Sequence, residues 1–154
     1  MAWGNPSLSY RRVATQTAPP GQLVLMLYEG VLRFLDQALA GFEKEDPAEF
    51  NATISNNVLR AQEIIRELDR SLNLSLGGEL AVQLRRLYDY FDRRLMQSNV
   101  RKEKDGIREV IGRVSTLRNA WASMLRGESA PLENPGPEQE LVTAAAQGEY
   151  RPAS

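Results

Sequence analysis

The sequence contains no cysteine and no histidine among its 154 residues. Without cysteine, disulfides, thiol catalysis and thiolate zinc sites are excluded. Without histidine, the chain lacks the commonest general base, metal ligand and near-neutral switch. A di-iron helical bundle of the Glu-x-x-His type is excluded for the same reason. The missing cysteine fits a reducing compartment, so we expect a cytoplasmic protein with no cofactor and no bound metal.

The chain also lacks a charge imbalance and a long apolar run, and no secretory signal is expected. Its net charge is −1, which gives no electrostatic reason to expect a nucleic-acid partner or an acidic membrane surface. The longest apolar run is far shorter than the roughly 20 residues that cross a bilayer, so no membrane insertion is expected. Residues 1–7 have neither a basic n-region nor an apolar h-region.

Four segments carry the apolar spacing of amphipathic helices, at approximately residues 22–43, 47–72, 78–99 and 105–126. Asp46, Pro47 and Glu49 form a helix start of the capping-box type. Asp105 is expected as an N-cap, and Gly127 as the residue that ends the last helix. Because the breaks between helices are short, the predicted fold is all-α, an antiparallel up-down four-helix bundle.

The bundle is expected to occupy residues 22–127 and to have an extension at each end. Residues 1–21, the leader, are predicted to be mostly irregular because prolines and a glycine interrupt them. Residues 128–154, the tail, contain four prolines and five acidic residues but only Arg151 as a base. This composition predicts a largely disordered tail, in which residues 141–146 form at most a transient helical turn.

The first helix is apolar over a wide arc. Residues 23–28 form an unbroken apolar run, and the apolar side chains of this helix sweep through roughly 200° at about 100° per residue. One core face needs about half of that arc. Two compatible interpretations stay open. The helix is the most buried one, with the leader packed over its second face, or part of the arc is a groove that receives a partner helix.

The candidate partner-binding residues lie in the leader and on three helices. Two are apolar anchors of the leader, three belong to the wide arc, and two lie off the apolar stripes of the second and third helices: Tyr10, Val13, Leu23, Leu27, Tyr28, Leu59 and Tyr90. Off-stripe apolar residues are usually ordinary surface residues when they occur singly. Tyrosine is nevertheless a good interface anchor. Leu59 and Tyr90 are therefore both candidates.

No catalytic constellation is found in the sequence. Gly77 and Gly78 lack the surrounding pattern of a phosphate-binding loop. The carboxylates that lie near arginines in sequence are expected to form solvated ion pairs instead of an acid–base pair; they are Asp69, Glu79, Asp89 and Asp92. We therefore predict that the protein is not an enzyme.

An ordered set of segments resembles the flagellin-specific export chaperone family, FliS. The set consists of Tyr10 with residues 13–20 (VATQTAPP), then 22–30 (QLVLMLYEG), 33–35 (RFL), 60–68 (RAQEIIREL), 76–80 (LGGEL), 87–95 (LYDYFDRRL), 98–99 (SN) and 119–121 (NAW). It spans approximately residues 8–125. Two departures stand out. At the helix start, the family commonly has Ala-Ser-Pro where this chain has Ala18-Pro19-Pro20, and Gly21 occupies a position where a helix former is common. The acidic tail is also longer than the family pattern requires.

The resemblance implies a cytoplasmic bundle that binds the C-terminal helical region of flagellin, prevents premature polymerisation and presents flagellin to the type III export machinery. In this family the N-terminal segment is thought to cover part of the binding surface and to move when flagellin binds. Export-gate components and other flagellar regulators are further candidate partners. The alternative from another class is a structural or regulatory adaptor that self-associates through the first helix.

Overall fold

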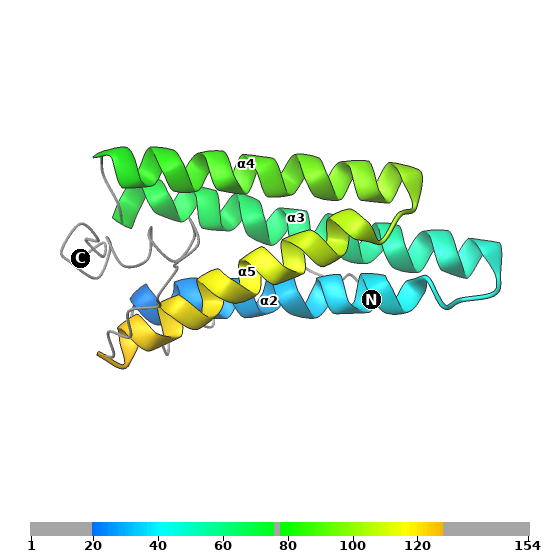
Figure 1. Cartoon of the computed structure of the whole chain (residues 1–154), viewed down its shortest axis with the longest axis horizontal. Helices are drawn as coiled ribbons and strands as arrows, with labels where there is room; N and C mark the ends of the chain where they lie inside the picture. The colour runs from blue at the N-terminus through cyan, green and yellow to red at the C-terminus, as the bar shows by residue number, and fades with distance from the viewer. Residues whose placement is uncertain (1–19, 76–77, 128–154) are drawn as a thin grey trace, which may run out of the picture.

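The computed structural model describes residues 20–75 and 78–127 as four helices. They are α2 (Pro20–Gly41), α3 (Pro47–Ser75), α4 (Gly78–Arg101) and α5 (Asp105–Leu125). Each helix packs on the next in the chain, and α5 also packs on α2, which closes the circuit. Figure 1 shows α3 and α4 side by side, with α5 running obliquely across α2. The predicted all-α antiparallel bundle is confirmed, whereas the predictions for the leader and the tail lie outside the described residues.

Local capping explains the start of α3 and the end of α5. The backbone N–H of Glu49 donates to Asp46 Oδ2 at 3.0 Å, as the predicted N-cap requires. Gly127 has a positive φ of 73°, and its N–H donates to the Met124 carbonyl at 3.0 Å, which confirms the predicted glycine stop. The prediction that Asp105 is an N-cap is wrong by one position. Lys104 is the N-cap, and its side chain forms no capping hydrogen bond. Asp105 is the first residue of the helix, where its negative charge interacts favourably with the helix dipole.

The turn after α4 uses a lysine where glycine would be usual. Lys102 has a φ of 53°, a conformation that costs energy for a residue with a side chain. Its Nζ donates to Ser55 Oγ at 2.9 Å, to the Asn99 carbonyl at 2.8 Å and to Asn99 Oδ1 at 2.6 Å. These bonds join the end of α4 to α3 and offset the backbone strain. Burial lowers the pKa of Lys102.

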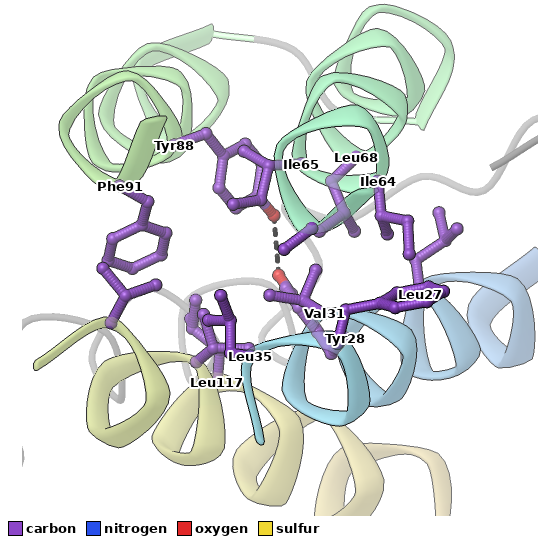
Figure 2. Close-up of a cluster of buried hydrophobic side chains, with 14 of the residues drawn as sticks. Leu27, Tyr28, Val31, Leu35, Ile64, Ile65, Leu68, Tyr88, Phe91 and Leu117 are labelled. Atoms are coloured by element: carbon purple, nitrogen blue, oxygen red, sulfur yellow. Dashed lines mark hydrogen bonds between the residues drawn. The ribbon is translucent and has the colours of Figure 1, made fainter. Parts of the chain in front are cut away.

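The core lies along the bundle axis and receives side chains from all four helices. Leu35 of α2, Ile64 of α3, Phe91 of α4 and Leu117 of α5 are each 0% exposed and appear together in Figure 2. The buried positions of α4 recur every three or four residues, the spacing that places side chains on one face of a helix. The sequence periodicity therefore identified the core faces correctly.

Helices α4 and α5 approach closely where Ser98 meets Gly106. Ser98 is buried, and a Cβ added at Gly106 would clash with Ser98 Oγ and lie 3.0 Å from the Arg94 carbonyl oxygen. The backbone at that point leaves no room for a side chain. Gly112, two turns further along α5, has nothing within 4 Å of an added Cβ.

This difference predicts opposite effects for the same substitution at two positions of one helix. Gly106→Ala forces α4 and α5 apart and should lower the free energy of unfolding by about 1–3 kcal/mol. Gly112→Ala, the matched control, should raise it by about 0.5–1 kcal/mol because alanine is the better helix former. Urea unfolding followed by circular dichroism measures both changes. Equal effects of the two variants would show that the α4–α5 approach is not tight.

Candidate functional site

Two neighbouring helices, α3 and α5, cover the wide apolar arc of α2. Of residues 23–28, Leu23 and Met26 are half-buried and the other four are buried. Helix α2 packs on both α3 and α5, so its arc serves two interfaces instead of one. Among the described residues, no large hydrophobic side chain of α2 is exposed. The expectation that this helix is buried on most sides is met, and the additional cover by the leader stays a prediction.

Leu27 and Tyr28, two of the predicted partner-binding residues, lie in the core. Both are 0% exposed. The Tyr28 and Tyr88 hydroxyls are hydrogen-bonded at 2.6 Å (Figure 2), and the Tyr28 ring meets Trp121 edge-on with the ring centroids 6.3 Å apart. Burial raises the pKa of both phenols far above the ordinary value. In this conformation Leu27 and Tyr28 stabilise the bundle, and a partner reaches them only where the core opens.

The buried tyrosine pair makes a prediction about stability that a double-mutant cycle tests. Tyr28→Phe or Tyr88→Phe alone leaves the other hydroxyl buried without its partner and should cost about 1–3 kcal/mol. The double variant removes both polar groups and should recover most of that loss. Urea unfolding of the four proteins gives the coupling energy. Losses that simply add in the double variant would mean that the hydroxyls act independently.

The start of α2 is bonded to the end of α5. The Trp121 Nε1–H donates to the Gly21 carbonyl at 2.9 Å in a buried site. A Cβ at Gly21 would lie 2.6 Å from Leu125 Cδ2, the end of a side chain that is 40% exposed and would have to shift. This contact uses the space that Gly21 leaves, at the helix start where the chain departs from the family pattern. It also places half-buried Leu23 beside the point where the leader joins the bundle.

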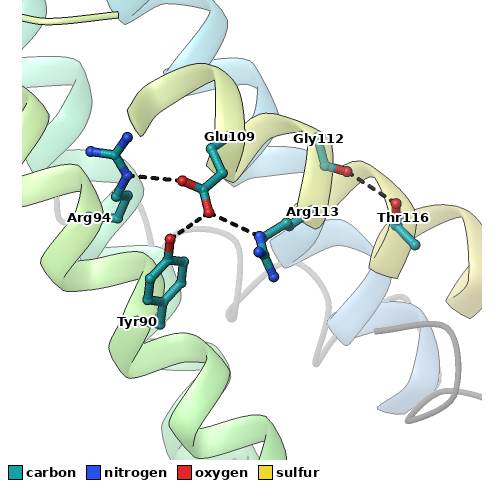
Figure 3. Close-up of polar contacts among 6 residues, drawn as sticks. All are labelled: Tyr90, Arg94, Glu109, Gly112, Arg113 and Thr116. Carbon is teal, nitrogen blue, oxygen red and sulfur yellow. Dashed lines mark hydrogen bonds and ion pairs between the residues drawn. The ribbon is translucent and has the colours of Figure 1, made fainter. Parts of the chain in front are cut away.

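Tyr90 belongs to a polar cluster between α4 and α5 (Figure 3). Glu109 accepts bonds from the Tyr90 hydroxyl at 2.5 Å, from Arg94 Nε at 2.9 Å and from Arg113 Nε at 3.1 Å. The Arg113 guanidinium also lies 5.4 Å from the centre of the Tyr90 ring. The hydrogen bond from Tyr90 lowers the pKa of Glu109 most, and the bond from Arg94 lowers it further. The hydrogen bond between Tyr90 and Glu109 also raises the pKa of Tyr90. Tyr90 therefore helps to hold the two helices together.

Leu59 belongs to an exposed apolar surface on α3 and α4. Leu59 is 51% exposed, Met96 is 52% exposed and Val100 is 79% exposed; we call these three residues the α3–α4 patch. The interpretation of the sequence found Leu59 but missed the other two. Their signal was available, because Met96 and Val100 are one helical turn apart and both lie off the apolar stripe of α4.

Two hydrogen bonds across the α3–α4 seam put Leu59 and Met96 at the same level. Ser55 Oγ donates to Asn99 Oδ1 at 3.0 Å, and Gln62 Nε2 donates to the Asp92 carbonyl at 3.1 Å. Leu59 lies between the two α3 residues in sequence, and Met96 lies between the two α4 residues. Because the helices are antiparallel, the two exposed side chains flank one stretch of the seam.

The described residues do not bring the predicted site residues into one place. Gly41 lies against Thr53, so the antiparallel register sets Leu23 level with Ser71, about 18 Å along α3 from Leu59. Leu27 and Tyr28 lie in the core, and Tyr90 lies on the α4–α5 seam. Tyr10 and Val13 are outside the described residues. Their common role in binding a partner stays a prediction.

The acidic residues considered as catalytic candidates form surface contacts. Arg85 pairs with Asp69 at 3.1 Å, Arg93 with Asp89 at 3.4 Å and Arg66 with Asp92 at 3.8 Å. Glu79 Oε1 accepts a bond from Gln83 Nε2 at 3.4 Å. The predicted ion pairs are thus observed for three of the four carboxylates. Within residues 20–75 and 78–127, no three potential ligands gather as a metal site, and none of the four helices is long and apolar enough to cross a membrane.

Comparison with known proteins agrees with the resemblance that the ordered motifs carry. Residues 4–128 match the protein family described as flagellar protein FliS. The chain belongs to the FliS family. The flagellar secretion chaperone FliS of Bacillus subtilis (strain 168) is 38% identical over 128 residues, which cover 83% of this chain and 92% of that protein. The FliS of Salmonella typhimurium is 35% identical over 108 residues, covering 70% of this chain and 78% of that protein.

A third relative, the flagellar secretion chaperone FliSB of Pseudomonas aeruginosa, is 33% identical over 104 residues, covering 68% of this chain and 79% of the relative. The FliS match ends one residue into the tail. Residues 129–154 therefore lie beyond the part of the chain that the family describes.

Proposed function

We propose that this chain is a cytoplasmic chaperone that binds the C-terminal helical region of flagellin, prevents its premature polymerisation and assists its delivery to the flagellar type III export apparatus. The observation that carries the proposal is the match of residues 4–128 to the FliS family. The relatives that share up to 38% identity are named flagellar secretion chaperones. Export-gate components and other flagellar regulators are further proposed partners.

The proposed chaperone mechanism is driven by the free energy of flagellin binding and requires no ATP, metal or nucleophile. A flagellin terminal segment that is amphipathic would self-associate through its apolar face, and burial of that face on the chaperone removes it from self-association. The proposed surface begins at half-buried Leu23, and the leader residues Tyr10 and Val13 are proposed to cover it. Leu27 and Tyr28 would join it when the core opens, and Leu59 and Tyr90 are proposed as outer contacts.

The adaptor alternative has less support from the described helices. Self-association through α2 would need an exposed apolar face on that helix. All five large hydrophobic residues that are exposed among the described residues belong to α3, α4 or α5. For this reason we propose no second function.

Calorimetric titration with flagellin from the same organism tests the proposal. Full-length flagellin should bind, and flagellin that lacks its C-terminal helical segment should not, because the apolar face that the chaperone buries is then missing. The truncated flagellin is thus the matched control. Absence of binding to either form, with the chaperone helical by circular dichroism and the flagellin monomeric, would overturn the proposal.

Removal of the leader tests whether it covers the binding surface. A chain that lacks residues 1–16 keeps all of α2, which begins at Pro20. If the leader covers the surface in about nine molecules of ten, its removal should tighten the apparent Kd about tenfold, because every molecule is then competent to bind. The same titration measures the change. An unchanged or weaker affinity would mean that the leader is not a cover.

A further inference from the structure

We propose that the tail folds back on its own bundle and docks residues 138–146 on the α3–α4 patch. This inference concerns a segment beyond the FliS match and does not depend on flagellin binding. Leu59, Met96 and Val100 are exposed on two adjacent helices, and apolar side chains grouped on a surface commonly mark a contact site.

The helix end beside the patch offers a positive charge to the acidic tail. Residues 93–104 of the chain, which include Met96 and Val100, contain five basic residues and one acidic residue. Three of these bases already pair with carboxylates of the bundle, and exposed Arg101, next to Val100, is the base proposed to meet the tail. The tail contains five acidic residues and one basic residue, a net charge of −4. Opposite net charges favour association and set the orientation of the partners.

The tail contains one short apolar segment with two carboxylates before it. Glu138 and Glu140 lie within three positions before Leu141 and Val142, and three alanines follow within the next four positions. A helical turn formed over this segment on docking would present a small apolar face beside two carboxylates. The apolar face would pack on Leu59 and Met96, with the carboxylates near Arg101 at the end of α4.

The tail is long enough to reach the patch from the place where α5 ends. Helix α5 ends beside the start of α2, because Trp121 bonds to Gly21, and α4 begins at that same end of the antiparallel bundle. Met96 lies 18 residues beyond Gly78, about 27 Å along α4. Two helix spacings of about 10 Å each separate α5 from the outer face of the seam, which makes the path about 34 Å. The 14 residues from Gly127 to Leu141 span up to about 46 Å when extended.

Covalent linkage lets a weak contact suffice. A segment on a short flexible linker has an effective concentration of about millimolar at its site. A contact with a Kd of several hundred micromolar between separate molecules would therefore be mostly occupied within one chain. Such a contact is weak enough for a stronger partner to displace the tail from the patch.

Oxidation of Met96 by hydrogen peroxide gives a readout at the patch itself. If the tail is docked in about two-thirds of the molecules, Met96 should oxidise about threefold faster after residues 128–154 are removed, because only the undocked fraction reacts. Mass spectrometry of peptides measures the rate. Met26 and Met124, which are half-buried elsewhere, serve as internal references and should keep their rates.

Two variants of the full chain separate docking from other effects of truncation. Leu141→Asp with Val142→Asp should reproduce the faster Met96 oxidation, and Leu132→Asp, which changes an apolar residue outside the docking segment, should not. Equal Met96 rates in the wild type, the truncated chain and the double variant would overturn the proposal. Met96 protection that is independent of the tail but increases with protein concentration would also overturn it, and would assign the patch to a second copy of the chain.

Discussion

The structure depends on the burial of α2, whose apolar arc is too wide for one neighbour. Helix α3 covers one flank, and α5 covers the other by crossing α2 obliquely. That crossing brings Trp121 onto the Tyr28 ring and its indole N–H onto the Gly21 carbonyl. Gly21 leaves the space that the Leu125 side chain occupies. A residue that is unfavourable for starting a helix thus makes room for a side chain of another helix.

Polar contacts determine how α4 is held inside this arrangement. On its inner face, Tyr88 meets Tyr28 across the bundle. On one side, Tyr90 and Arg94 bond to Glu109 of α5, and on the other side the Asp92 carbonyl accepts a bond from Gln62 of α3. Each bond exists in one register of the helices only. Apolar burial supplies most of the stabilisation of such a bundle, and these bonds select a single alignment.

Helix number, core faces and two caps could be predicted from the sequence, because Asp46 and Gly127 act on their own neighbours. The ends at Lys102 and Lys104 could not, since the Lys102 turn depends on Ser55, 47 residues earlier. The candidate site was predicted only in part. Periodicity marks Leu59 as off-stripe, but it cannot show that Met96 lies level with it across a seam. Nor can it show that Tyr28 faces Tyr88. Each tyrosine lies on the apolar stripe of its own helix, and the contact depends on how α2 and α4 pack in the bundle.

The bond between Trp121 and the Gly21 carbonyl joins residues 100 positions apart, and this separation bears on the order of folding. Contacts between distant residues carry a large loop-closure entropy, so local helix pairs are favoured to form earlier. The α2–α3 pair needs only the short turn between Gly41 and Pro47. Docking of α5 on α2 would then be a late step, and interactions formed after the transition state chiefly control the unfolding rate. The contact that closes the bundle would thus govern how long a folded molecule persists.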